Sequence, residues 1–242
     1  MSKLYEVLEN ASRERERLEM AKTPMIPPCE LPGWKADMEM MGLYQAMDTA
    51  LGRKTSRVVQ FIGSQTGEGC STIVRNLAGA AAAKVEESVL LLDLDSRPSY
   101  SDVNNDITFQ YHLEKLNVQA ASPLDKAFCQ TEQGNLTVST FSTDSDPILA
   151  LLDMSHDDRL WERLREQFSL ILIDAPPAAD SHMGFSLLGR CDGVVLVVRA
   201  EKTRWPAAVS VKKRVAQEGG KIIGAVYNDR RQYAPQWVQK YL

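Results

Sequence analysis

Residues 63–72 read Gly-Ser-Gln-Thr-Gly-Glu-Gly-Cys-Ser-Thr, a run whose residue types suit the binding of phosphate. The ordinary pattern for such a loop is G-x-x-x-x-G-K-[ST]. Glycines let backbone N–H groups approach the phosphate, and the lysine and hydroxyl meet its charge and its Mg²⁺. Here Cys70 stands at the lysine position, while Ser71 and Thr72 keep the hydroxyls. The run therefore predicts a nucleotide loop that has lost its main positive charge.

Carboxylates follow two apolar segments elsewhere in the chain. Asp93 and Asp95, with Arg97 after them, end the segment 88–95, and Asp174 ends the segment 170–174. In a parallel sheet, ligands bind where strands reach their carboxyl ends. One such aspartate is often only a helix cap, but two strand ends beside a phosphate loop are typical of a site for a nucleotide–Mg²⁺ complex.

Strands and helices alternate along most of the chain, which predicts an α/β protein. The strands are solidly apolar, so we expect a mostly parallel sheet with both faces covered, a three-layer P-loop NTPase domain. The expected strands are residues 57–63, 88–95, 136–141, 170–174, 194–198 and 222–227. The expected helices lie near 36–51, 70–84, 147–167, 181–190 and 203–218, and residues 99–120 are expected to be a loop region.

The first 33 residues differ from the rest. Leu4, Leu8 and Ala11 follow helical spacing in a charged segment that suits either a solvated helix or an arm for docking a partner. Prolines then interrupt the chain up to Gly33. We expect residues 1–33 to be an N-terminal helical arm with a Pro-rich linker, and residues 34–242 to be the nucleotide-binding domain.

Composition excludes several classes. The chain has 242 residues, of which 44% are hydrophobic and 25% charged, with a net charge of −4, so a general nucleic-acid or anionic-membrane binder is disfavoured. No apolar run approaches the ~20 residues that span a bilayer, and the N-terminus has no signal-peptide core. Four widely spaced cysteines indicate neither a zinc site nor a disulfide framework. We expect a cytoplasmic protein.

Together these motifs resemble the bacterial tyrosine kinases of capsule and exopolysaccharide assembly. That family is a branch of the deviant P-loop ATPases related to MinD and ParA. Residues 90–98 (LLLDLDSRP) resemble its D-x-D-x-R motif, and residues 67–72 resemble its loop P-G-E-G-K-S-T. The likeness runs in order over roughly residues 55–230, through the acidic strand 168–177, residues 192–199 with Thr203, and residues 224–228.

The resemblance implies ATP or ADP and Mg²⁺ as cofactors. It implies a catalytic role for Asp93, Asp95 and Asp174, and metal binding by Ser71, Asp93 and Asp174. The implied nucleotide-binding residues are Gly67, Glu68, Gly69, Cys70, Ser71, Thr72, Arg97 and Asn228. Arg97 could pair with phosphate or with Asp95. Asn228 is expected near the adenine, although a turn-forming role is open as well.

The chain departs from the family in three places. Cys70 cannot supply the lysine's charge, which points to impaired phosphotransfer. The alternative is that another cation substitutes, with Arg97 and Lys202 as candidates, whereas Arg75 lies more than a helical turn past the loop. Residues 37–48 have no arginine, so the family's assembly motif E-x-x-R-x-x-R is missing. The tyrosine-rich tail is reduced to Tyr233 and Tyr241. Cys70 at a helix N-terminus also suits a reactive thiol.

Three functions fit this combination. The one we favour is a kinase-like regulator of polysaccharide polymerisation and export with impaired phosphotransfer, recruited to the inner face of the membrane by a co-polymerase or chain-length protein. It would be a monomer or dimer when isolated and would not bind nucleic acid. An active tyrosine autokinase is disfavoured by Cys70, and a MinD- or ParA-like positioning ATPase is disfavoured by the D-x-D-x-R motif.

Overall fold

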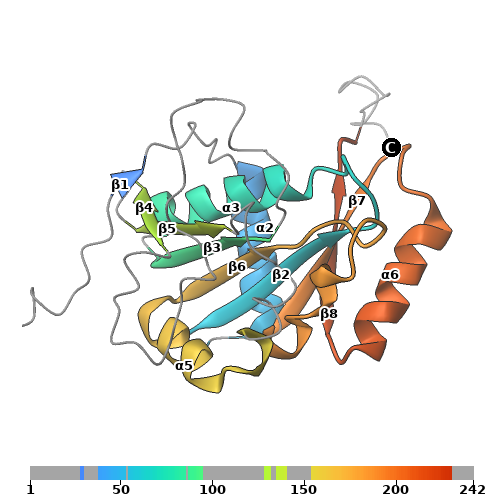
Figure 1. Cartoon of the computed structure of the whole chain (residues 1–242). Helices are drawn as coiled ribbons and strands as arrows, with labels where there is room; N and C mark the ends of the chain where they lie inside the picture. The colour runs from blue at the N-terminus through green and yellow to red at the C-terminus, as the bar shows by residue number, and fades with distance from the viewer. Residues whose placement is uncertain are drawn as a thin grey trace, which may run out of the picture.

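The computed structural model describes residues 28–29, 38–52, 54–85, 87–94, 128–131, 135–140 and 154–230 (Figure 1). Its strands are β1 (Pro28–Cys29), β2 (Arg57–Gly63), β3 (Val89–Asp93), β4 (Cys129–Thr131), β5 (Leu136–Thr140), β6 (Leu170–Asp174), β7 (Gly193–Arg199) and β8 (Ile222–Asn228). Its helices are α2 (Met38–Leu51), α3 (Cys70–Lys84), α5 (Asp158–Gln167) and α6 (Trp205–Gln217), with two 3₁₀ turns, η3 (Met183–Phe185) and η4 (Leu188–Arg190).

One sheet holds all of these strands, in the order β1-β4-β5-β3-β6-β2-β7-β8. The run from β5 to β8 is parallel at every pairing, and only β4 is antiparallel to its neighbour β5. Every residue of β2, β3 and β6 is buried, as expected for strands covered on both faces. The predicted mostly parallel sheet is confirmed.

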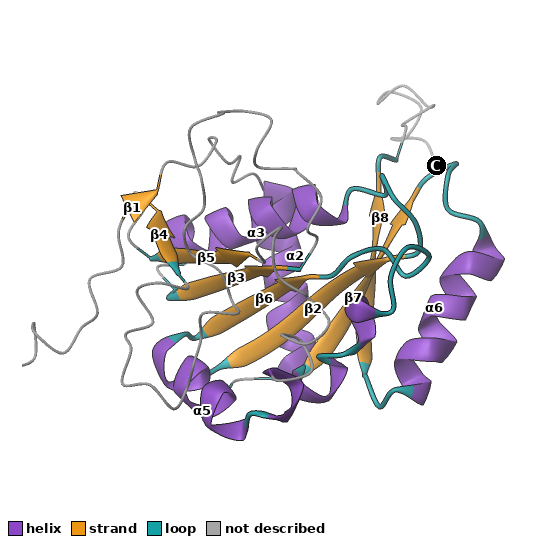
Figure 2. Cartoon of the chain, viewed as in Figure 1, coloured by secondary structure: helices purple, strands orange, loops and turns teal. Residues whose placement is uncertain are grey.

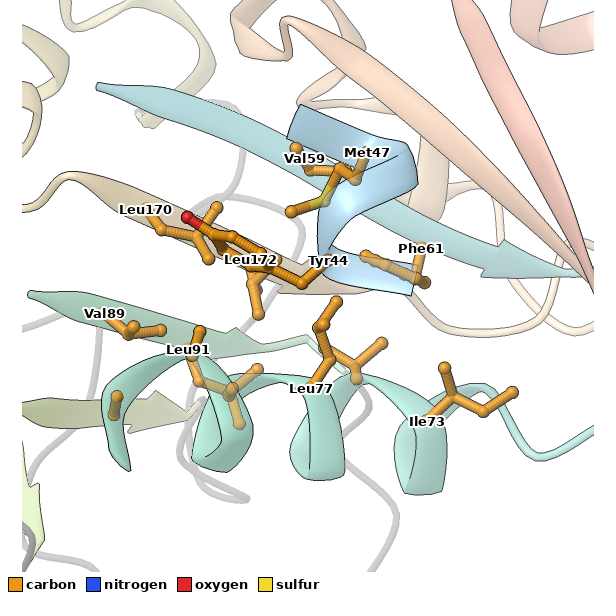
Figure 3. Packing of buried hydrophobic residues seen from close by; sticks show 14 of the residues in the cluster. Tyr44, Met47, Val59, Phe61, Ile73, Leu77, Val89, Leu91, Leu170 and Leu172 are labelled. Atoms are coloured by element: carbon orange, nitrogen blue, oxygen red, sulfur yellow. The ribbon is translucent and has the colours of Figure 1, made fainter. Parts of the chain in front are cut away.

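Helices α2 and α3 cover one face of the sheet (Figures 1 and 3). Alternate residues of β2, such as Val59 and Phe61, point to this side and pack with Leu77 of α3 and with Tyr44 and Met47 of α2. The short alanines of α3 allow the helix to lie close to the strands. This layer holds the helix that follows the glycine loop in a fixed position over β3 and β6.

The opposite face is covered by α5, the two 3₁₀ turns and α6 (Figure 2). Val58 and Ile173 pack here against Trp161 and Leu164 of α5. Ile62 and the inward side of β7 pack against α6. The protein is therefore the three-layer α/β domain that the sequence predicts.

Two expected helices are interrupted, and residues 147–153 of the first lie outside the described residues. Asp157 accepts a hydrogen bond at 3.0 Å from Leu160 N, which caps α5 and separates it from the helical turn at residues 154–156. Residues 181–190 form two 3₁₀ turns instead of one helix. Gly184 lies so close to the loop after β6 that a Cβ there would be 3.0 Å from the Pro176 carbonyl oxygen. Glycine also has a low helix propensity, which disfavours one continuous helix here.

Arg57 anchors α2 at the edge of the sheet opposite the glycine loop. Its buried guanidinium donates to Asp48 of α2 and to Glu87, which precedes β3, and it lies over the Tyr44 ring at 5.6 Å. The Tyr44 hydroxyl also donates to Glu87, at 2.6 Å. These partners come from α2 and from the α3–β3 connection, so one cation fixes the helical layer to the start of β2.

Several predictions lie outside the described residues. They are the helical arm at residues 3–20, the loop region 99–120 and the tail tyrosines Tyr233 and Tyr241. The predicted linker contributes the two-residue edge strand β1. Where the chain is described, none of its helices has the length and apolar character needed to cross a membrane.

Candidate nucleotide site

The glycine loop connects β2 to α3 at the carboxyl edge of the sheet, beside the ends of β7 and β8 (Figure 2). Gly67 and Gly69 have φ angles of 79° and 90°, in the left-handed region that favours glycine. A Cβ at Gly69 would also lie 2.1 Å from the Asn228 side-chain nitrogen. The predicted strand–loop–helix arrangement is present, with α3 beginning at Cys70.

Glu68 orders the loop from within. Its side chain is almost wholly buried, at 1% exposure, and one carboxylate oxygen accepts from the backbone N–H of Ser64 at 2.5 Å and of Gln65 at 3.2 Å. The other oxygen accepts from the Ser64 hydroxyl at 2.6 Å and from the Thr203 hydroxyl. Charge-assisted bonds of this kind are strong, so Glu68 is expected to hold the loop in its shape.

Asn228, at the end of β8, contacts the loop directly. Its side-chain amide donates to the Glu68 carbonyl oxygen at 2.8 Å. This bond attaches the loop to β8, which is the last of the described strands in the sequence. A position near the adenine remains a prediction for this residue.

Two cations bind the outer side of the loop. Lys202 Nζ donates to the Thr66 carbonyl oxygen at 2.8 Å, and Arg199 donates to that of Gly67 at 2.9 Å while it also pairs with Asp229. Lys202 is one of the two predicted substitutes for the missing lysine. The structure brings it to the loop, where its ammonium group donates to a carbonyl group.

Asp93 and Asp174 lie side by side at the ends of β3 and β6, where their Cα atoms are register partners. Both are buried, with 3% and 1% exposure. The structure thus brings together two of the three aspartates to which the sequence analysis gave catalytic roles. Asp95 and Arg97 lie outside the described residues.

Asp174 is held in an unfavourable environment for a charge. Burial and the neighbouring Asp93 carboxylate raise its pKa to about 7, and Ser71, Arg75 and Cys70 partly offset this rise. Ser71 and Cys70 begin α3 and face the carboxylate, yet neither Asp174 oxygen accepts a hydrogen bond of ordinary geometry from a described residue. A buried carboxylate of this kind is suited to a cationic ligand.

Sequence reasoning set Arg75 aside as too far past the loop, but the structure places it in the site. Its Nη2 atom lies 2.9 Å from Asp93 Oδ2, in an ion pair with side-chain exposures of 16% and 3%. Arg75 is one turn after Ser71 on α3, and helical side chains lean toward the N-terminus. The four-residue spacing from Ser71 could therefore have placed it near the site, even though its Cα lies beyond the loop.

The predicted magnesium ligands fit a metal only in part. Asp174 has buried oxygens available and Ser71 has a hydroxyl nearby, which suits an ion such as Mg²⁺. Asp93 does not fit in the same way, because Arg75 already neutralises its carboxylate. Among the described side chains, no group of three or more His, Cys, Asp or Glu residues could hold a metal.

Comparisons of the sequence lead to tyrosine kinases. No protein-family model matches the chain. A tyrosine-protein kinase CpsD of Streptococcus agalactiae is 25% identical over 175 residues, which are 72% of this chain and 76% of that protein. The tyrosine-protein kinase ptk of Acinetobacter johnsonii is 27% identical over 185 residues, but these cover only 25% of its length, against 76% of this chain.

Comparisons of the structure agree. The kinase domain of Escherichia coli tyrosine kinase ETK matches with a TM-score of 0.69 and 20% identity, over 81% of this chain and 78% of that one. The VpsO kinase domain matches with a TM-score of 0.65 and 25% identity, over 80% and 97%. The cell-division ATPase MinD of Pyrococcus furiosus matches at 0.59 and 19%, over 77% and 78%. The chain is therefore similar in sequence to bacterial tyrosine kinases, and its fold resembles that of their kinase domains and of MinD.

Proposed function

We propose that this protein is a tyrosine-kinase-like regulator of capsule or exopolysaccharide assembly whose phosphotransfer is impaired. The observation that supports it is Cys70, which occupies the lysine position of an otherwise assembled loop. A neutral thiol gives no charge stabilisation to a transferring phosphoryl group, and a thiolate would repel it. Loss of one such electrostatic group often costs about 10²- to 10³-fold in rate.

The nearby cations do not simply restore the missing charge. Lys202 and Arg199 donate to loop carbonyl groups, and Arg75 pairs with Asp93. Each would have to give up or share a protein partner to reach a phosphate. That requirement supports weakened transfer rather than a full replacement of the lysine.

We propose that ATP or ADP still binds, more weakly than in a loop that has its lysine. The backbone of residues 67–72 retains the glycines and the helix N-terminus on which phosphate groups bind. Two proteins of this fold were solved with such ligands: MinD from Pyrococcus horikoshii with Mg-ADP, and cobyrinic acid a,c-diamide synthase from Mycobacterium smegmatis with an ATP analog and magnesium. These support nucleotide binding as a property of the fold.

The proposed partner is a membrane co-polymerase or chain-length protein, which would hold this cytoplasmic protein at the inner face of the membrane. The support is the resemblance to capsule-assembly kinases. With no arginine in residues 37–48, the isolated chain should be a monomer or dimer at micromolar concentration, measured by light scattering. A stable octamer would contradict this. Deletion of residues 1–20 should reduce pull-down of the partner if the arm docks there.

One set of measurements tests the activity. Titration calorimetry with ATP and Mg²⁺ should show weak binding, and a phosphotyrosine blot of the purified protein should show very slow or undetectable labelling. Cys70→Lys should strengthen nucleotide binding because it returns a direct phosphate contact, whereas the control Cys70→Ser should not. Self-labelling of the wild-type protein at an ordinary kinase rate of ~1 s⁻¹ or more would overturn the proposal.

An active autokinase is the second candidate, because Lys202 contacts the loop. If Lys202 supplies the missing charge, Lys202→Met should abolish tyrosine labelling that the wild-type protein shows. A MinD-like positioning ATPase would hydrolyse ATP without labelling tyrosine. The same blot and a phosphate-release assay therefore separate the three functions.

A further inference from the structure

Arg75 places a fixed positive charge inside the acidic pair at the end of the sheet. Its Nη2 atom is 2.9 Å from Asp93 Oδ2, and only 16% of its side chain is exposed. The Asp93 carboxylate is almost completely buried. A guanidinium held this way is a permanent cation, because arginine stays protonated in proteins.

The Arg75 guanidinium lies next to two carboxylates, not one. Asp93 is the register partner of Asp174, so the guanidinium lies beside both carboxylates. A divalent ion bound to the same pair would meet a like charge a few ångströms away, in a buried environment where screening is weak.

We propose that Arg75 is a built-in cation that takes the place of a divalent metal at Asp93. The Arg75–Asp93 ion pair, next to a partner carboxylate on the adjacent strand, is the observation that carries this inference. This inference rests on the proposed function, because it assumes that Asp93 and Asp174 occupy the place where a nucleotide-binding site would hold its metal ion. It gives a second cause for impaired phosphotransfer, independent of Cys70, since the metal and Arg75 would compete for one carboxylate.

Mn²⁺ binding to the full chain without nucleotide tests the proposal, with unbound Mn²⁺ measured by electron paramagnetic resonance. The wild-type protein should bind Mn²⁺ weakly. Arg75→Gln removes the charge but keeps a hydrogen-bond donor, and it should tighten Mn²⁺ binding by about tenfold or more, as expected for loss of a close like charge. Arg75→Lys keeps the charge and should bind as the wild-type protein does.

Two controls show where the metal binds. Adding Asp93→Asn to Arg75→Gln should abolish the gain, which places the ion at the acidic pair. Arg165→Gln removes a comparable ion pair, Arg165 to Asp192 at 2.8 Å, away from the loop. It should leave Mn²⁺ affinity unchanged, which separates a local charge effect from general loosening of the fold.

Several outcomes would overturn the proposal. Equal Mn²⁺ affinity in the wild-type protein and Arg75→Gln would do so, as would a tight wild-type site that Asp93→Asn removes. If Arg75→Gln does not fold, two measurements still test the proposal. One is Mn²⁺ binding to the wild-type protein with and without Asp93→Asn. The other is thermal unfolding of Arg75→Lys, which Mn²⁺ should not stabilise. Rapid self-labelling of tyrosine would defeat the proposed function instead, since the Mn²⁺ series involves no nucleotide.

Discussion

The carboxylate of Asp174 and that of Asp93 end adjacent parallel strands in direct register, so two acidic groups meet within the buried edge of one sheet. Like charges in such a place disfavour each other's ionisation. The partner carboxylate and burial together raise the pKa of Asp174 to about 7. Asp174 is therefore a source of instability that depends on pH.

Asp174→Asn should stabilise the protein, and more so at high pH. The folded-state pKa lies above the ordinary value, so the wild-type protein is destabilised increasingly as pH rises from about 4 to about 7. Above that range the substitution should add on the order of 2 to 4 kcal/mol to the free energy of unfolding, and near pH 5 clearly less. Urea unfolding at about pH 5 and pH 8 measures this. An equal gain at both pH values would contradict the assigned cause.

Asp192→Asn should destabilise the protein, the opposite of the effect expected for Asp174→Asn. Burial alone would raise the pKa of Asp192, but hydrogen bonds from Lys54, the Val58 N–H and Arg165 outweigh it and lower the pKa. The ionised carboxylate therefore stabilises the fold above its unfolded pKa, and this contribution is lost as pH falls through the folded pKa. Urea titration should show a loss of about 1 to 3 kcal/mol at neutral pH that shrinks in acid.

Glu68→Ala should destabilise the protein even without nucleotide. The change leaves the N–H groups of Ser64 and Gln65 without their carboxylate partner, at a cost of about 2 to 4 kcal/mol. Thr203→Val removes one donor to Glu68 and should cost about 1 kcal/mol. Thr49→Val is the matched control, since its hydroxyl makes an exposed bond within α2. A Glu68→Ala protein as stable as wild type would show that the inward carboxylate does not hold the loop.

Gly69→Ala should cost more than Gly52→Ala. Both glycines have a left-handed φ, but a Cβ at Gly52 has nothing within 4 Å, whereas at Gly69 it would meet the Asn228 amide. The control should lose about 1 kcal/mol from backbone strain, and Gly69→Ala about 2 kcal/mol or more. Asn228→Ala should remove the steric part, so the double variant should be less destabilised than the sum of the two. Strict additivity in the unfolding free energies would contradict the contact.

Much of this site follows from sequence, and the exceptions have physical reasons. Asp93 and Asp174 could be paired because apolar strands ending in carboxylates share one edge of a parallel sheet. Arg75 could not be assigned to Asp93, since helical spacing gives its direction but not how α3 lies over β3. The inward carboxylate of Glu68 depends on Thr203, which the fold brings to it from the β7–α6 connection. In the segment 181–190, Gly184 lies close to the Pro176 carbonyl, a tertiary contact that the sequence does not reveal.

Glu68 and Gly69 each make contacts within the fold that need no nucleotide. Glu68 holds the backbone of its own loop, and Gly69 leaves room for an amide 160 residues after Glu68 in the chain. Folding alone would therefore favour this Glu-Gly pair, whether or not the loop takes part in phosphate chemistry. In proteins of this kind a recognisable loop sequence indicates an intact fold. Catalytic activity has to be inferred separately, from the charged residues around the loop.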